Sequence, residues 1–362
     1  MAQMKYFYEL TISSSPHVHS PITTRTIMRD VLIALAPALV GSVYFFGLRA
    51  LMVVLVSAAA SVFFEWGYCK LTHTSCKVYD FSAIITGVLL AFVCPVTIPY
   101  WTIIIGDFFA IIVVKMVFGG IGRNIVNPAL AGRAFMFSWP ALMTHWVAVG
   151  FENAAGVIDT TDAVTSATPL YHMGQGMMPE VGILDLFLGK VSGCLGETSA
   201  LLLLVGLGYL LVRKVITLRI PAAFIGTVAV LTFLFPQGHD RITWMASQVL
   251  SGGLMLGAIF MATDYVTSPI TKLGQVVFGI GCGVLTVVIR YFGGYPEGVS
   301  YAILIMNLLT WAIDKATPQT QFGISKADKK VAEAERKAAK AAEKAEKLQK
   351  QVEKLHAEGG HK

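Results

Sequence analysis

Ten long apolar stretches constrain this sequence more than any other feature. A helix needs about 20 mostly apolar residues to cross a bilayer, and each stretch meets or approaches that length. The stretches are 30–47, 50–69, 80–97, 98–118, 129–149, 197–212, 219–236, 245–263, 273–292 and 299–314. Since lipid offers the backbone no hydrogen-bond partners, such stretches fold as helices. The sequence predicts an all-α integral membrane protein with about ten transmembrane helices.

Composition and charge agree with a membrane protein and do not indicate nucleic-acid binding. Hydrophobic residues make up 55% of the 362 positions and charged residues only 14%, against roughly 25% charged in soluble domains. Residues 315–362 hold twelve of the 28 Lys and Arg and seven of the 22 Asp and Glu. Most of the net charge of +6 therefore belongs to this tail. The positive net charge thus does not indicate a nucleic-acid-binding surface.

The remaining positive charges are distributed unevenly between alternate loops. With a cytoplasmic N-terminus, the loops on the cytoplasmic side carry twelve Lys and Arg, and the opposite loops carry four. Cytoplasmic loops are enriched in Lys and Arg, so we expect both termini in the cytoplasm. The first 29 residues lack the apolar core of a cleavable signal peptide, and the first membrane helix is expected to direct insertion.

Short similarities indicate an internal repeat. Residues 37–41 are similar to 221–226, the pair Gly87 and Pro99 to Gly257 and Pro269, and 118–120 to 292–294. Five helices per half is an odd number, so the halves would form inverted repeats, as in transporters. The alternative is chance recurrence among 34 Gly and 14 Pro.

The repeat and the composition together divide the chain into five segments. They are a cytoplasmic N-terminal segment 1–29, a first transmembrane half 30–149, an extracytoplasmic loop 150–196, a second transmembrane half 197–314 and a tail 315–362. The tail is rich in Lys, Ala and Glu, and Ser325 and Asp328 have the spacing of a helix capping box. We expect it to form an exposed cytoplasmic helix, with partner binding as a less favoured alternative to a dispensable extension.

No motif in the sequence indicates a metal site or a catalytic group. The cysteines are scattered, without a CxxC pair or a histidine at metal-binding spacing: Cys69, Cys76, Cys94, Cys194 and Cys282. The chain also lacks a nucleophile motif or a triad in the polar loop. We therefore expect no metal ligands and no catalytic residues.

Acidic residues in apolar stretches are costly in lipid and usually face a pathway or a partner. Glu65 and Asp107 lie deepest in their stretches and are candidates for an ion pathway. Asp30, Asp80 and Asp314 lie at the edges of stretches, where anchoring at the membrane interface is the favoured interpretation.

The segment 119–135, GGIGRNIVNPALAGRAF, combines flexible glycines with Arg123, Asn124 and Asn127. Asn127 followed by Pro128 is typical of a helix start, with Asn as the N-cap and Pro at the first helical position. The segment is either a re-entrant turn that lines a polar site or a simple corner between two helices.

The segment 162–170, DAVTSATPL, places three hydroxyl groups, Thr165, Ser166 and Thr168, in the long polar loop. By its residues alone it is an ordinary turn and helix start, because short polar side chains cap free backbone donors. However, Asp162 to Thr168 resembles D-x-x-[ST]-x-A-T, the flavin-attachment motif of the NqrB/RnfD family of membrane subunits. Further segments resemble this family in the same order: 15–17, 80–91, 119–135 and 196–199.

The resemblance covers roughly residues 13–314 and implies FMN bound to Thr168 through a phosphoester, with hydrogen bonds from Thr165 and Ser166 to the phosphate. It also implies a flavin transferase for maturation and a second, non-covalent flavin, riboflavin, for which Arg123, Asn124 and Asn127 are candidate ligands.

The RnfD branch is favoured because only about 30 residues precede the first apolar stretch. It implies one subunit of a six-subunit complex in a bacterial or archaeal cytoplasmic membrane, which couples electron transfer between ferredoxin and NAD to sodium or proton translocation. Two alternatives stay open. One is an NqrB-type subunit of a sodium-pumping NADH:quinone reductase, and the other is a solute transporter without a redox role.

Overall fold

The computed structural model describes residues 22–74, 78–146, 168–179, 181–197, 199–238, 240–293 and 297–318, together with residues 331, 334, 335 and 338 of the tail. The chain separates into two compact units, Met1–Ala316 and Thr317–Lys362. Every regular element in the described residues is helical, which confirms the all-α prediction for this part of the chain.

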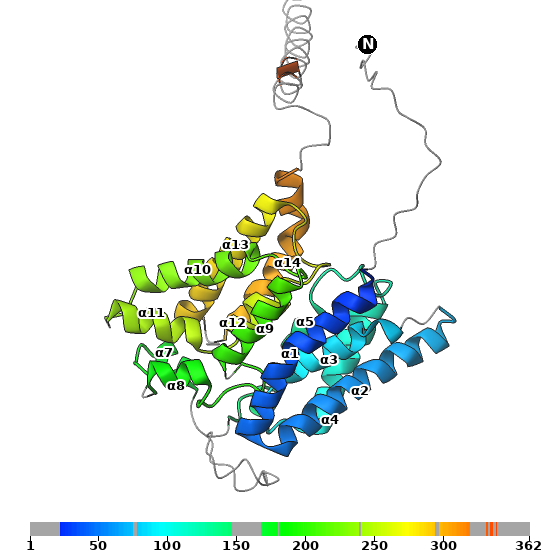
Figure 1. The fold of residues 1–362 in the computed structure, drawn as a ribbon, viewed down its shortest axis with the longest axis horizontal. Helices are drawn as coiled ribbons and strands as arrows, with labels where there is room; N and C mark the ends of the chain where they lie inside the picture. Colours follow the sequence, from blue (N-terminus) through cyan, green and yellow to red (C-terminus); the bar gives the residue numbers. More distant parts are fainter. Residues whose placement is uncertain are drawn as a thin grey trace, which may run out of the picture. The chain divides into compact units, whose positions relative to one another are not determined.

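The elements of the first unit follow one another in three groups (Figure 1). The first group is α1 (Thr24–Phe46), α2 (Leu48–Leu71), η1 (Val78–Asp80), α3 (Ser82–Phe92), α4 (Tyr100–Phe108), the π-helix η2 (Phe109–Met116), α5 (Pro128–Met136) and α6 (Pro140–Met143). The short helices α7 (Pro169–Gly174) and α8 (Ile183–Leu188) come next. The third group is α9 (Ala200–Val212), α10 (Arg219–Leu234), α11 (Arg241–Leu250), α12 (Leu254–Leu256), the π-helix η4 (Gly257–Met261), α13 (Lys272–Phe292) and α14 (Val299–Ala316).

Among the described residues, four helices are long and apolar enough to cross a membrane: α1, α2, α13 and α14. A fifth span is possible if α11 is taken together with α12 and η4, which follow it at a bend of 63°. The helices α3, α9 and α10 are apolar but shorter. The described residues thus have the composition and helix lengths of a multi-pass membrane protein.

Two expected spans are short helices in the structure. α3 has 11 residues and α5 has 9, which at 1.5 Å per residue gives about 16 Å and 14 Å, against a hydrocarbon core of about 30 Å. Pro95 and Pro99 follow α3, and Pro140 follows α5. Proline lacks an N–H donor and clashes with the preceding turn, so neither helix continues through it.

The helices pack into two groups that meet along α1 and α9. α2 packs on α3 and α4 in the first group, and α10 packs on α11 and α13 in the second. α1 lies beside α9 (Figure 1). α5 contacts α14. Small residues allow this close approach: a Cβ on Gly87 would lie 2.7 Å from the Ser57 carbonyl oxygen, and one on Gly206 would lie 2.4 Å from the Ala34 carbonyl oxygen. Such small-residue contacts are typical of helix pairs in membranes.

Candidate functional site

Thr168 forms the N-cap of α7. Its backbone is extended, and its Oγ1 accepts a hydrogen bond from the Tyr171 N–H at 3.3 Å. Pro169 follows at the first helical position, where its missing N–H costs nothing. The hydroxyl oxygen therefore acts as an acceptor, and this cap does not require its proton. Thr165 and Ser166 lie outside the described residues, and so does the rest of the loop before Thr168.

A small cavity lies beside Thr168. Its walls come from α7, α8, residues 191–193, the turn at 250–252, and the two acids Glu197 and Glu297. The cavity holds about 20 Å³, far below the 300–1,000 Å³ of typical ligand pockets. It connects the predicted flavin-attachment residue with a buried ionic cluster.

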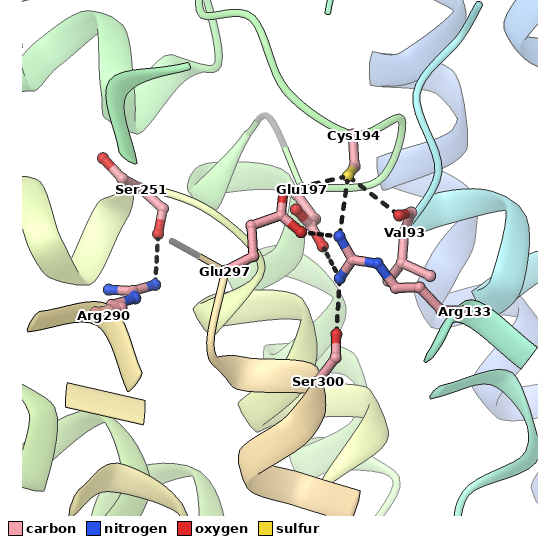
Figure 2. A network of polar contacts seen from close by, with 8 residues as sticks. All are labelled: Val93, Arg133, Cys194, Glu197, Ser251, Arg290, Glu297 and Ser300. Carbon is pink, nitrogen blue, oxygen red and sulfur yellow. Dashed lines mark hydrogen bonds and ion pairs between the residues drawn. The ribbon is translucent and has the colours of Figure 1, made fainter. Parts of the chain in front are cut away.

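Arg133 is the centre of this cluster (Figure 2). Its side chain is only 2% exposed, and it donates from Nη1 to the Ser300 hydroxyl at 2.7 Å and from Nη2 to Glu297. The Glu197 carboxylate lies 3.8 Å from the same guanidinium. The Cys194 thiol, 3.7 Å from Arg133 Nη2, donates to the Val93 carbonyl. The cluster thus ties α5 to the start of α14 and to the loop before α9.

A second arginine lies close to this cluster. Arg290 on α13 donates to the Ser251 carbonyl (Figure 2). It also donates to the Gln248 carbonyl and side chain, and these contacts hold it on the turn between α11 and α12. Two arginines and two glutamates therefore share one buried region with balanced charge. Buried charges of this kind persist only when paired and hydrogen-bonded.

Three side chains of this cluster are of types that can bind a metal ion. Cys194, Glu197 and Glu297 bring possible ligand atoms within 4.8 Å of one another. The Arg133 guanidinium already contacts this group as its cation, so we assign the cluster as an ion-pair network. Sequence reasoning missed it, although charged residues inside apolar stretches, namely Arg133, Glu197 and Arg290, were an available signal.

The two deep acids, Glu65 and Asp107, are both buried in the first helix group, and their surroundings differ. Glu65 on α2 is paired with Lys115 on η2 at 2.7 Å, and Lys115 also donates to the Ser82 hydroxyl. Asp107 on α4 accepts hydrogen bonds from Ser57 and Ser61, each at 2.9 Å. One acid is therefore neutralised by a lysine, and the other has only hydroxyl groups around it within the described residues.

The acids at the edges of the stretches also have partners. Asp30 on α1 is paired with Arg213 at 3.1 Å. Asp80 accepts from the backbone and side chain of Ser82, and Asp314 accepts from the Ile270 N–H. These contacts join neighbouring elements to one another.

The glycine-rich segment lines a larger cavity. Gly119, Gly120 and Gly122 all have positive φ values, a conformation that other residues rarely adopt. Asn124 and Asn127 line a cavity of about 100 Å³ between α1, α3, α9 and η4, whereas Arg123 is not part of its wall. Asn127 caps α5 as expected, and its side-chain amide donates to the Met261 carbonyl.

Comparison with known proteins places these features in a family. The model of the NQR2, RnfD, RnfE family matches residues 11–323. The chain belongs to this family. It is 46% identical over 327 residues to the D subunit of the Na(+)-translocating ferredoxin:NAD(+) oxidoreductase complex of Acetobacterium woodii, a match that covers 89% of this chain and 98% of the relative.

Two further family members have similar coverage. The D subunit of the proton-translocating ferredoxin:NAD(+) oxidoreductase complex of Clostridium ljungdahlii is 43% identical over 328 residues, or 86% of this chain and 96% of the relative. The D subunit of the ion-translocating oxidoreductase complex of Halorhodospira halophila is 36% identical, over 83% of this chain and 92% of the relative. The family match confirms the resemblance seen in the sequence motifs.

Proposed function

We propose that this chain is the RnfD-type subunit of an ion-translocating ferredoxin:NAD(+) oxidoreductase complex, active only within that complex. The observation that carries this proposal is the 46% and 43% identity to two such subunits over nearly their whole length. One of these relatives is named for sodium and the other for protons. Identity alone is therefore compatible with either coupling ion.

Two electron-transfer assays on membranes distinguish this proposal from the NqrB-type alternative and from the transporter alternative. Membranes of a strain without this chain should lose ferredoxin-dependent NAD⁺ reduction and regain it when the chain is restored. Loss of NADH-dependent quinone reduction instead would support the NqrB-type alternative. Normal electron transfer in both assays would support a transporter without a redox role.

We further propose that Thr168 carries FMN through a phosphoester formed by a flavin transferase. Transfer from FAD would join the Thr168 oxygen to the FMN phosphorus, release AMP and free the hydroxyl proton. The N-cap contact supports this assignment, because Oγ1 accepts from Tyr171 and so does not use the proton that is lost. When bound, the flavin supplies one- and two-electron redox chemistry.

The small cavity beside Thr168 limits where the flavin could lie. With about 20 Å³ it cannot hold an isoalloxazine ring, so the ring would lie outside it. The cavity is lined by Glu197 and Glu297 and by no lysine or arginine among the described residues, so no cation in its wall would hold a flavin phosphate there by electrostatics. A covalent bond removes the need for a cationic phosphate site. Hydrogen bonds from Thr165 and Ser166 to the phosphate remain part of the proposal.

The test of attachment is flavin fluorescence on a denaturing gel, with mass spectrometry of the loop peptide. Thr168→Ala should abolish the fluorescence, and the parent peptide should carry FMN less one water on Thr168. Thr144→Ala removes a comparable exposed hydroxyl and should keep the flavin, as should Thr165→Ala and Ser166→Ala. An unmodified Thr168 in protein made with an active transferase would contradict the assignment.

For the architecture, we propose two inverted five-helix halves, 30–149 and 197–314, joined by the loop 150–196. The corresponding packing of α2 on α3 and α4 and of α10 on α11 and α13 supports this repeat. The segment 1–29 and the tail 315–362 would then both lie in the cytoplasm. A cysteine placed at Gly174 should react with an impermeant thiol reagent in intact cells, and one at Lys326 should not. The reverse pattern would refute this orientation.

For ion movement, we propose that the pathway involves the buried acids Glu65 and Asp107.

A second flavin, riboflavin, is proposed for the cavity lined by Asn124 and Asn127. Their amides could pair with the ring carbonyl and N–H groups, but the cavity of about 100 Å³ is smaller than a riboflavin site requires, so binding would need its walls to move apart. Arg123 would reach the flavin only after such a movement.

A further inference from the structure

Asp107 is a buried acid without a counter-charge in the described part of the chain. It is 0% exposed, and its Oδ1 accepts from the Ser57 and Ser61 hydroxyls. Its Oδ2 is buried and has no hydrogen-bond partner among the described residues. An ionised carboxylate in this position would have one oxygen neither solvated nor paired, which is strongly unfavourable.

The charged groups around α4 all have other partners. On the helices that pack against α4 these groups are Arg49, Glu65 and Lys70 on α2, Lys115 on η2 and Arg133 on α5. Arg49 donates to the carbonyls of Val96 and Thr97, and Lys70 lies over the Trp66 ring. Glu65 and Lys115 neutralise each other, and Arg133 is held by Glu297. Asp107 must therefore be neutralised by something other than these side chains.

The number of hydroxyl protons available for hydrogen bonds also indicates that Asp107 is neutralised. Ser57 Oγ lies 2.8 Å from the Gly87 carbonyl and 2.9 Å from Asp107 Oδ1, and both of these oxygens would accept its proton. One hydroxyl has only one proton to donate. A proton on Asp107, or a cation between these oxygens, is needed to make both contacts favourable.

The hydrogen-bonding atoms recorded at this position are oxygens: the Asp107 carboxylate, the hydroxyls of Ser57 and Ser61 that donate to it, and the Gly87 carbonyl that lies 2.8 Å from the Ser57 hydroxyl. Hydroxyl, carbonyl and carboxylate oxygens are the ligands that hard cations prefer. The single negative charge matches a single positive charge. The chemistry therefore fits one proton or one sodium ion.

A polar series connects this position with the larger cavity. Ser57, Ser61 and Glu65 are spaced four residues apart on α2, so they lie on one face of the helix. Glu65 contacts Lys115, and Lys115 and Ser82 both line the cavity. The distance along α2 from Glu65 to Ser57 is about 12 Å at 1.5 Å per residue.

We propose that Asp107, Ser57 and Ser61 form a binding site for one monovalent cation, which reaches it from the cavity past the Glu65–Lys115 pair. The proposal rests on the ion-translocating function proposed above and gives the two acids different roles. Asp107 binds the ion, whereas the charge of Glu65 is already balanced by Lys115.

The test is infrared spectroscopy of the full-length chain purified from its native membrane with its partner subunits. Spectra are recorded in sodium-free buffer, with added sodium and over a range of pH, and the Asp107→Asn spectrum is subtracted from the parent spectrum. The expected result is a carbonyl band of a protonated carboxyl group in sodium-free buffer. Glu65→Gln is the matched control and should leave this band in place.

Loss of the band on adding sodium at constant pH identifies a sodium site in competition with protons. Loss only at high pH, without an effect of sodium, identifies a proton site. Ser61→Ala removes one hydroxyl from the ion. It should therefore change by about tenfold the sodium or proton concentration at which half of the Asp107 band is lost. The absence of an Asp107 band in acidic, sodium-free buffer would overturn the proposal.

Flavin content and ferredoxin-dependent NAD⁺ reduction are measured on the same samples. If the parent protein lacks both, the proposed function fails, whatever the infrared result. If both are present and the band is absent, only the Asp107 site fails.

Discussion

Replacing Arg133 by methionine tests the buried cluster that joins α5 to α14. Methionine keeps much of the side-chain length and removes the cation that contacts Glu297, Glu197 and Ser300. Removing one partner of a buried ion pair typically costs 3–5 kcal/mol, because it leaves an uncompensated charge. Arg133 is 2% exposed and Glu197 is 3% exposed, so solvent does little to reduce this cost. We expect a loss of about 4 kcal/mol in the free energy of unfolding.

The buried cysteines provide the assay. The thiols of Cys69, Cys94, Cys194 and Cys282 are all buried, so a thiol-reactive fluorophore reports their exposure as the protein unfolds. At roughly 2 °C per kcal/mol for a chain of this size, Arg133→Met should lower the melting temperature by about 8 °C. The double variant with Glu297→Gln should lose less than the sum of the two single variants, since the removed charges would interact.

The matched control is Arg123→Met, because Arg123 is exposed and belongs to no ion pair in the described residues. It should change the melting temperature by less than about 1 °C, as surface substitutions usually do. If Arg133→Met melts at the temperature of the parent, the cluster does not stabilise the contact between α5 and α14, and the reasoning is refuted.

Three further predictions concern single contacts. Asn127→Ala removes the N-cap of α5 and should cost about 1 kcal/mol in chemical unfolding; an unchanged midpoint would contradict the cap. Gly87→Ala places a methyl group against the Ser57 backbone and should cost about 1–3 kcal/mol in the same assay, whereas full stability would show that α2 and α3 can separate. Hydrogen bonds from Thr243 hold the pKa of Asp240 below its usual value. Since the folded pKa is the lower one, the cap on α11 stabilises at neutral pH and weakens as the pH falls through that lowered value. The protection of the α11 amides, measured relative to their intrinsic exchange rates at each pH, should fall in acid, and Asp240→Asn should remove that pH dependence.

The sequence predicted the long helices well because apolar length decides them. α2 was expected at 50–69 and spans Leu48–Leu71, and α13 was expected at 273–292 and spans Lys272–Phe292. The ends of α3 and α5 were missed because hydropathy continues past the residues where proline stops the helix. Asn127 as the cap of α5 was predicted correctly, since capping depends on the local sequence alone.

The site could be predicted only in part, because its partners are distant in the chain. Glu65 and Asp107 were identified as buried acids, but nothing in their neighbourhood reveals that Lys115, 50 residues from Glu65, neutralises one of them. The contact between Arg133 and Glu297 joins residues 164 positions apart. Packing of α5 against α14 creates this pair, and no local pattern encodes it.

The two π-helices, η2 and η4, both border the larger cavity, one from each half of the chain. Lys115 belongs to η2, and Ile259 and Phe260 belong to η4. A π-helix bonds each N–H to the fifth residue back, so it contains more residues per turn than an α-helix. Changing the bonding register by one residue would rotate everything beyond the change by about 100° around the helix axis. Such a change in η2 would turn Lys115 away from Glu65, so the winding of this helix decides whether that acid keeps its counter-charge.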